Sequence, residues 1–394
     1  MKSGDVIGGY LVVTEPTNAD GGKCMWAFAE KDGKEYFLKR FLEPKRPREG
    51  SGGSAVSRRI RLETCQDFEE RHKSIMKLLR PDASGAGNLV LATDFFYAGS
   101  TYYKVTERID TTSLEKPQSL DPKQKSVLLK TLGTSLRLLH DIDVVHGDLK
   151  PANVLVQKRE GAAFHTAKLI DFDDSYLSGD PPAREDIAGD SLYGAPEWRR
   201  YVQGDESVES RDLTTAVDIF ALGLMAHHYL TGSLPEFEGR FGSPADAVNA
   251  DEPLVVNERL STPMQGLIAA MTAADPGSRP TAATFLAALK DPEVCALHST
   301  PQPRPAAPAT GGGRSRPRPE PSDEPRRSRV QFNPPDRSGH RPPGATTTDE
   351  TTGGSTAGST GGTADASTIT PRKSRVKINL GHRAGGLPGS HSTD

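Results

Sequence analysis

The order of apolar patterns along the first 295 residues constrains the fold more than any other feature. Alternating apolar and polar residues, typical of strands, come first and are interrupted by one helical pattern between Leu62 and Leu79. Beyond Leu213 the apolar spacing is helical. Strands that precede helices, rather than alternating with them, predict an α+β fold with a small β-rich N-lobe and a larger α-helical C-lobe.

The strands of the small lobe are separated by turn signals at residues 18–22 and 32–33. In the larger lobe, apolar residues at helical spacing follow Asp121-Pro122. The strands expected from these patterns are 10–14, 23–30, 34–41, 88–96, 101–107, 153–157 and 167–170.

The chain changes character near residue 299. From there it is rich in Pro, Gly, Ser, Thr and Arg, and its single aromatic residue is Phe332. Residues 299–394 carry 14 basic and 8 acidic side chains, whereas the part before them carries 35 and 44. Such a segment buries too little apolar surface to offset the entropy of ordering. We therefore expect a folded domain at residues 1–295 and a disordered tail at 296–394.

Several classes of protein are disfavoured by composition. No run of about 18 apolar residues exists, and no apolar stretch follows Lys2, which argues against a membrane span and a secretory signal. The three cysteines are odd in number and lack CxxC spacing, so we expect neither disulfides nor a zinc site, and a cytoplasmic location. The basic loop at residues 43–57 has no aromatic residue for base stacking, so a nucleic-acid partner is not expected.

The most specific stretch is HGDLKPANVLV at residues 146–156, followed 23 residues after Asp148 by Asp171. Asp148, Lys150 and Asn153 share one tight loop that leads into a strand, so they can address one small volume. The carboxylate can orient a hydroxyl group and the ammonium can neutralise developing phosphate charge. The amide oxygen of Asn153 and the carboxylate of Asp171 are hard ligands of the kind that Mg²⁺ prefers.

Together these motifs resemble the catalytic core of the eukaryotic-like Ser/Thr protein kinases over residues 10 to about 291. The resemblance implies a two-lobed kinase fold, ATP and Mg²⁺ as cofactors, and Ser/Thr side chains of protein substrates as acceptors. It implies that Asp148 is the catalytic base and Lys150 the phosphate-neutralising lysine. Asn153 and Asp171 would be the magnesium ligands, and Lys39 would grip the α- and β-phosphates.

The same resemblance assigns the adenine site. The N-lobe would span about 1–107 and the C-lobe about 110–295. Backbone groups of Glu107 and Ile109, where the lobes join, would contact adenine, with Thr106 behind it.

Lys39 also needs an acidic partner on the following helix, where Glu69 and Glu70 are both available. Helical phase favours Glu69, because it lies seven residues before the apolar Met76. A bend in the helix could shift this phase, so Glu70 remains an alternative.

Two further motifs of the family are structural. Residues 189–197 (GDSLYGAPE) resemble the end of an activation segment, and Glu197 is expected to pair with Arg279. Asp218 resembles the buried aspartate that braces the catalytic loop.

The phosphate-binding loop departs from the family. Of the three positions that usually carry glycine, here Ala19, Gly21 and Cys24, only Gly21 fits. The pair Gly21-Gly22 still permits backbone amides to approach a phosphate group, so Gly21 is kept as a cofactor-binding residue.

Other departures lie in the C-lobe. Gly147 replaces the arginine that pairs with a phosphorylated activation loop, so we expect activity without that phosphorylation. Asp173 replaces the glycine after Asp171-Phe172, which should penalise positive φ there. Asp190 stands where a threonine commonly closes onto the catalytic base.

Two rival hypotheses remain open. The sequences HGD and IDFDD (residues 170–174) are also similar to aminoglycoside and choline phosphotransferases, which phosphorylate small molecules. Lys150 and the Glu197 and Arg279 motifs favour a protein acceptor instead. A pseudokinase scaffold is the third hypothesis, supported by the eroded phosphate loop and opposed by the presence of the catalytic residues.

The tail contains a repeated motif, RSRVQFN at 327–333 and KSRVKIN at 373–379. Its alternating apolar residues could add as a strand to the sheet of a partner, and chance duplication of low-complexity sequence is the alternative. Ser328 and Ser374 lie beside several cations, which an acidic catalytic domain would select, so autophosphorylation is expected at Ser328, at Ser374 or at nearby threonines. Residues 329–332 also resemble a phosphatase docking motif, and a phosphatase or a phosphopeptide-binding protein would be the tail partner.

Overall fold

The computed structural model describes residues 1–19, 24–48, 54–79, 88–109, 114–158 and 161–303. The chain divides into two units, Met1–Gly313 and Arg314–Asp394, and the described residues all belong to the first. The expected tail from residue 304 onward, with both repeats, lies outside them. Among the described helices, none is long and apolar enough to cross a membrane.

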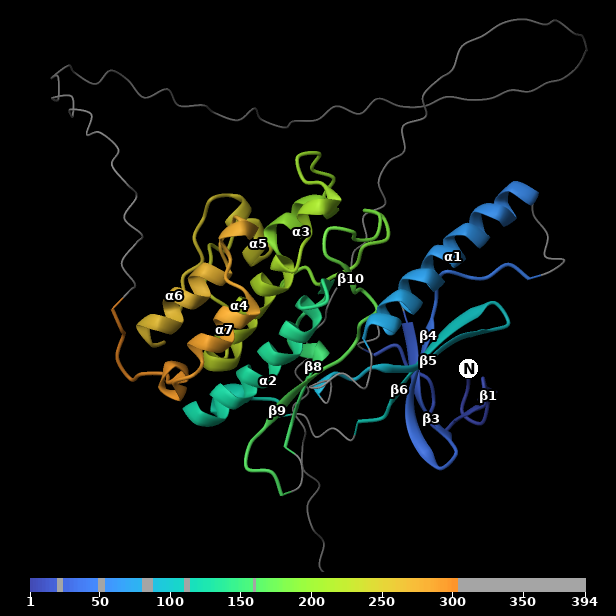
Figure 1. Cartoon of the computed structure of the whole chain (residues 1–394), viewed down its shortest axis with the longest axis horizontal. Helices are drawn as coiled ribbons and strands as arrows, with labels where there is room; N and C mark the ends of the chain where they lie inside the picture. Colours follow the sequence, from blue (N-terminus) through green and yellow to red (C-terminus); the bar gives the residue numbers. More distant parts are fainter. Residues whose placement is uncertain (20–23, 49–53, 80–87, 110–113, 159–160, 304–394) are drawn as a thin grey trace, which may run out of the picture. The chain divides into compact units, whose positions relative to one another are not determined.

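The N-terminal part is a six-stranded antiparallel sheet in the order β1-β2-β3-β4-β6-β5 (Figure 1). Prediction and structure agree to the residue for β4 and β6. The β5 strand begins later than expected, because Leu89 instead bridges to Leu169 of the C-lobe. The strands are β1 (Val6–Ile7), β2 (Tyr10–Val12), β3 (Cys24–Lys31), β4 (Lys34–Phe41), β5 (Ala92–Ala98) and β6 (Thr101–Glu107).

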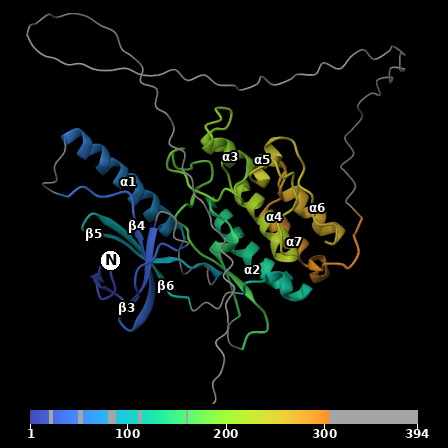
Figure 2. The ribbon, with the colours of Figure 1, turned by 180° about the vertical axis from the view of Figure 1, so that it is seen from behind.

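One long helix, α1 (Ala55–Leu78), accompanies this sheet (Figure 2). It begins earlier than the apolar pattern indicated, because Ser54 caps its N-terminus by accepting a hydrogen bond from the backbone N–H of Ser57. Its C-terminal half packs on the sheet through Phe68, whose ring contacts Phe41 and Phe95.

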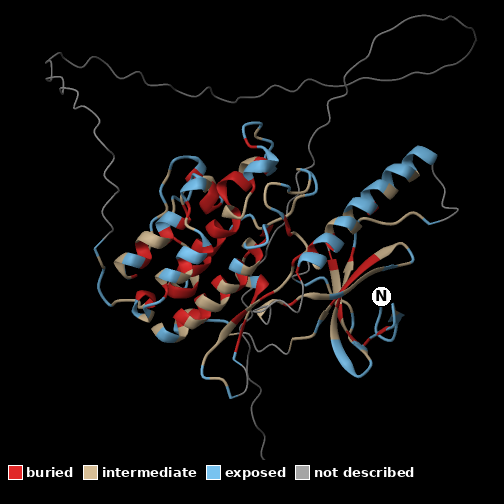
Figure 3. Cartoon of the chain, viewed as in Figure 1, coloured by how far each residue is buried: buried red, intermediate tan, exposed pale blue. Residues whose placement is uncertain are grey.

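Helices dominate the C-lobe, as the apolar pattern predicts. Buried residues concentrate around α4, which is enclosed on nearly all sides (Figure 3). The fold is therefore the two-lobed, protein-kinase-like α+β fold expected from the sequence. The helices are α2 (Pro122–His140), α3 (Pro196–Val202), α4 (Ala216–Thr231), α5 (Pro244–Asn249), α6 (Thr262–Met271) and α7 (Ala282–Ala288).

Two short antiparallel pairs hold the loops that carry the candidate chemistry. One pair is β7 (Val144–Val145) with β10 (Tyr176–Leu177), and the other is β8 (Val154–Gln157) with β9 (Thr166–Leu169). The loop from β7 to β8 contains Asp148, and the loop from β9 to β10 contains Asp171. Because the two loops start and end on paired strands, their side chains converge on one region.

The folded part extends past the boundary expected at residue 295. Leu297 bridges to Leu260, and the backbone N–H of His298 donates to the carbonyl of Arg259. The hydroxyl of Thr262 donates to the carbonyl of Pro303 at 2.7 Å. The start of the expected tail at 296 is therefore corrected to no earlier than residue 304. Composition did not reveal this, because these contacts use backbone groups.

An ion pair joins α3 to the segment before α7. Both terminal guanidinium nitrogens of Arg279 lie 2.7 Å from the Glu197 carboxylate, and the Arg279 side chain is fully buried. The same guanidinium donates to the carbonyls of Ala273, Ala216 and Ala274. The expected pairing of Glu197 with Arg279 is present, with its donors satisfied.

We expect Arg279→Met to lower the free energy of unfolding by about 3–5 kcal/mol, because it leaves Glu197 buried and unpaired. Arg240→Met removes an exposed arginine that pairs with Glu238 and Glu252, and should cost below about 1 kcal/mol. Urea unfolding of both variants measures the difference. Equal losses would show that the buried pair does not stabilise the C-lobe.

Candidate active site

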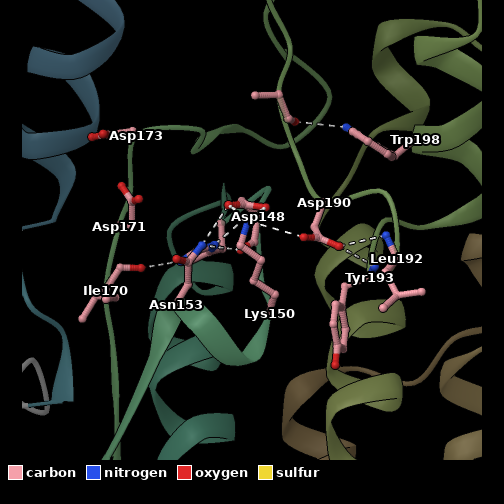
Figure 4. A network of polar contacts seen from close by, with 12 residues as sticks. Asp148, Lys150, Asn153, Ile170, Asp171, Asp173, Asp190, Leu192, Tyr193 and Trp198 are labelled. Carbon is pink, nitrogen blue, oxygen red and sulfur yellow. Dashed lines mark hydrogen bonds and ion pairs between the residues drawn. The ribbon is translucent and has the colours of Figure 1, made fainter. Parts of the chain in front are cut away.

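The loop between β7 and β8 brings three of the predicted residues together (Figure 4). Lys150 Nζ lies 2.8 Å from Asp148 Oδ2. The side-chain nitrogen of Asn153 donates both to the carbonyl oxygen of Asp148, at 2.8 Å, and to its Oδ2, at 2.9 Å. A 3₁₀ turn over Pro151–Asn153 sets this spacing. Asp148, Lys150 and Asn153 therefore surround one volume, as the sequence indicates.

Asp218 in the first turn of α4 holds the backbone of this loop. It is 1% exposed and accepts hydrogen bonds from the backbone N–H of His146, at 2.8 Å, and of Gly147, at 3.1 Å. His140 Nε2 lies 3.0 Å from the same carboxylate. The position of Asp148 thus depends on a buried carboxylate in the core of the C-lobe, which is the bracing role expected of Asp218.

Gly147 has a steric reason to be glycine. Its φ is +80°, and a Cβ at this position would lie 2.5 Å from the carbonyl oxygen of Asp174. An arginine at position 147 is therefore incompatible with this packing of the catalytic loop against the turn after β9. The sequence showed the missing arginine but not this contact.

We expect Gly147→Ala to lower phosphoryl-transfer turnover by more than about tenfold, because the catalytic loop must shift to relieve the clash. Gly161→Ala is the matched control, since Gly161 also has positive φ, +74°, but open space around it. Thermal unfolding and turnover of both variants separate the strain of a positive φ from the clash of the new Cβ with Asp174. Equal turnover in the two variants would contradict the steric account.

Asp190 adds a further carboxylate next to Lys150. Its carboxylate lies 3.5 Å from Lys150 Nζ, and its Oδ1 accepts from the backbone N–H groups of Leu192 and Tyr193. A pocket beside Asp148 is lined by residues of these two segments, among them Leu149, Asp190 and Tyr193, and by residues of α4. Asp190 therefore joins the activation-segment end to the catalytic loop through Lys150, in the place where a threonine is common.

Lys39, on β4, meets the turn after β9. Its Nζ lies 2.8 Å and 2.9 Å from the two carboxylate oxygens of Asp171, and 2.6 Å from Asp173 Oδ2. The positive φ in this turn falls on Asp171, at 63°, while Asp173 is outside that region. The structure thus brings Lys39 and Asp171 together and accommodates Asp173 without the backbone penalty.

The prediction that Lys39 forms an ion pair with Glu69 is wrong. Glu69 instead pairs with Arg46 and with Lys73, at 3.0 Å, and accepts a hydrogen bond from the hydroxyl of Tyr102 at 2.7 Å. Helical phase correctly turned Glu69 rather than the exposed Glu70 towards the sheet. It could not reveal that Arg46, from the segment after β4, lies beside Glu69.

Asn153 and Asp171 fit the requirements of a hard divalent cation. Both hydrogens of the Asn153 amide are directed at Asp148, so the amide oxygen is the atom left to coordinate a metal. The backbone N–H of Ile170, next to Asp171, donates to the carbonyl of Asn153 at 3.0 Å and fixes the two segments together. Among the described residues there is no cluster of three or more His, Cys, Asp or Glu side chains suited to a metal.

The remaining predicted cofactor residues lie at the edge of the described chain. Glu107 ends β6 opposite Tyr36 and is exposed, and Ile109 is half-buried next to residues outside the described ranges. The backbone N–H of Arg108, between them, donates to the carbonyl of Glu35 at 3.1 Å. Gly21 lies outside the described residues. Their contacts with a nucleotide stay predictions.

Three residues of this region were not singled out by sequence. Lys104 Nζ lies 2.6 Å from Asp173 Oδ1, and His72 is buried nearby. Asp174 carries a pKa raised to about 7, because burial and then the charges of Asp173 and Asp148 disfavour its ionised form. A lysine at an inward-facing strand position was the available signal for Lys104, whereas a lone His or Asp gives none.

Asp174 should make stability fall as pH rises. Its pKa is about 7 in the folded state against 3.8 unfolded, so the folded state binds the extra proton between those values. Wild type should lose stability relative to Asp174→Asn from pH 4.5 to pH 8, measured by urea unfolding in EDTA. A constant difference between the two proteins across this range would contradict the raised pKa.

The protein kinase domain family matches residues 22–289, and the chain belongs to this family. The chain is 29% identical over 174 residues to the serine/threonine-protein kinase PkaA of Streptomyces coelicolor, which covers 43% of this chain and 29% of the relative. It is 30% identical over 174 residues to the serine/threonine-protein kinase pkn2 of Myxococcus xanthus, covering 43% and 20%.

A longer alignment exists with a vertebrate protein. The serine/threonine-protein kinase pim-2 of Danio rerio is 24% identical over 288 residues, covering 64% of this chain and 84% of the relative. The chain spans less than a third of the length of the two bacterial relatives.

Proposed function

We propose that this protein transfers the γ-phosphoryl group of ATP to Ser or Thr side chains of proteins, with Mg²⁺ as cofactor. The observation that carries the proposal is the arrangement of Asp148, Lys150 and Asn153 in one loop, with Lys39 and Asp171 paired at the facing turn. The names of the similar kinases add support, since those proteins are described as serine/threonine-protein kinases.

Each side chain has a role that its position supports. Asp148 accepts the proton of the attacking hydroxyl, and Lys150 neutralises charge as that hydroxyl bonds to phosphorus. Lys39 would hold the α- and β-phosphates, while Asn153 and Asp171 would hold Mg²⁺. The bound metal supplies electrostatic stabilisation of the transferring phosphoryl group. Glu107, Ile109 and Gly21 are proposed contacts of the nucleotide.

A protein acceptor is favoured over a small molecule. The segment from Asp190 to Gly194 lies beside Asp148 and is held to the C-lobe core through the buried pair of Glu197 and Arg279. This apparatus shapes a surface on which an extended peptide could place its hydroxyl. A phosphotransferase that acts on small molecules would not need such a segment.

Activity without activation-loop phosphorylation is part of the proposal. The Gly147 position cannot carry the arginine that a phosphorylated loop would need, because its Cβ would meet Asp174. Asp190 already supplies a negative charge to Lys150 from the activation segment. In other kinases a phosphate group on the activation loop orders that loop. Here the carboxylate of Asp190 supports the same ordering without phosphorylation.

The tail is proposed as an intramolecular substrate and docking segment. Ser328 and Ser374 would be phosphorylated, and the motifs at 327–333 and 373–379 would bind a phosphatase or a phosphopeptide-binding protein.

The three buried cysteines are free thiols, which fits a reducing cytoplasm.

The experiment is incubation of the full chain with labelled ATP, Mg²⁺ and a basic Ser/Thr peptide, followed by phosphosite mapping. Asp148→Asn should lower transfer by more than about 100-fold, because the hydroxyl loses its proton acceptor. Asp141→Asn, at an exposed position after α2, is the control and should retain wild-type transfer. Phosphate found only on small molecules would favour the phosphotransferase, and full transfer by Asp148→Asn would reject the assigned base.

A further inference from the structure

One carboxylate lies between the buried Lys104 and the half-buried Lys39 beside the candidate active site. Lys39 on β4 and Lys104 on β6 are directly opposite each other in the sheet, so their side chains share a face. Asp173 Oδ1 accepts a hydrogen bond from Lys104 Nζ at 2.6 Å. Asp173 Oδ2 forms an ion pair with Lys39 Nζ at 2.6 Å without hydrogen-bond geometry, since the hydrogen bonds of Lys39 go to both carboxylate oxygens of Asp171. Asp173 therefore connects the central strands of the sheet to the turn that carries Asp171.

This cluster is nearly sealed from water. The side chains of Lys39, Asp173 and Lys104 are 14%, 10% and 8% exposed. Burial alone would raise the pKa of Asp173, but the ammonium groups of Lys104 and Lys39 hold it well below its usual range. Burial alone would lower the pKa of Lys39, but Asp173 and then Asp171 raise it well above its usual range. The ion pair therefore favours the charged forms of Lys39 and Asp173 against the effect of burial.

Helix α1 contributes a neutral side chain here rather than an acid. Among the described residues, the carboxylates paired with Lys39 both come from the turn after β9. His72 of α1 is 2% exposed, and its Nε2 has no hydrogen-bond partner in the described part of the chain. Burial and the charge of Lys104 lower its pKa well below 6.5, and its ring packs against Phe41, Phe68 and Phe95.

We propose that Asp173 is the positioning residue for Lys39 in phosphoryl transfer, in place of a glutamate on α1, with Lys104 as the anchor of Asp173. The inference rests on the proposed function and deepens it. The carboxylate that orients Lys39 lies two residues from Asp171, in one turn. Correct placement of Lys39 then depends on that turn and not on the position of α1.

The competing explanation is that Asp173 only neutralises Lys104. Removal of a single member cannot distinguish the two, because Asp173→Asn leaves Lys104 buried and unpaired in either case. Removing both charges does distinguish them. In the double variant Lys104→Met/Asp173→Asn no unpaired cation remains at position 104, so the fold is relieved while Lys39 still lacks its second carboxylate.

The test measures kcat and KM for ATP with the full chain and a Ser/Thr peptide. Asp173→Asn should lower kcat/KM by about 100-fold, since a misplaced contact of this kind costs about that factor. Lys104→Met/Asp173→Asn should regain the wild-type melting temperature but stay as inactive. Adding Lys39→Met to Asp173→Asn should cost below about threefold more, because both changes remove one interaction.

Asp94→Asn is the matched control, because Asp94 lies on β5 of the same sheet and bonds to Tyr10 at 3.3 Å, outside this cluster. It should keep wild-type kcat/KM. Activity of Asp173→Asn within about threefold of wild type would overturn the inference. Recovery of activity in the double variant would overturn it as well, since Asp173 would then only neutralise Lys104.

A second readout does not depend on activity. Competitive acetylation followed by mass spectrometry reports how reactive each lysine is, and Lys39 should react faster in Asp173→Asn than in Asp94→Asn. An inactive wild type would reject the proposed function. Even then, unchanged Lys39 reactivity would overturn the pairing on which this inference depends, and increased reactivity would support it.

Discussion

The ion pairs of Lys39 with Asp171 and Asp173 are the interactions on which the candidate site depends. They join β4 of the sheet to the turn after β9, and they link the side chain expected to hold phosphate directly to a side chain expected to hold Mg²⁺. Because these charges are largely buried, each needs its partner to remain ionised. The two halves of the site are thereby placed with respect to each other before any nucleotide is bound.

The C-lobe holds the loop between β7 and β8 in place next to these ion pairs. Asp218 fixes the backbone at His146 and Gly147, and Gly147 in turn packs on the carbonyl of Asp174. The loop between β7 and β8 and the turn after β9 are therefore in direct contact, so a shift in one displaces the other. This packing explains why glycine, and not arginine, occupies position 147.

The sequence predicted those features that depend on local pattern. Strand periodicity fixed the limits of β4 and β6, and the spacing from Asp148 to Asn153 was sufficient to predict one shared loop. Local pattern could not predict which residue, among several that are distant along the chain, a side chain contacts. Glu69 faces the sheet as its helical phase required, but Arg46 and Tyr102 reach it and Lys39 does not. Backbone contacts of residues 297–303 were likewise invisible to composition.

The most direct test of this account is a crystal structure of the protein with Mg²⁺ and a non-hydrolysable ATP analogue. We predict that Lys39 contacts phosphate while still paired with Asp173, that Asn153 and Asp171 coordinate the metal, and that Glu69 stays with Arg46. A structure in which α1 has moved to pair a glutamate with Lys39, with Asp173 released from it, would contradict the account.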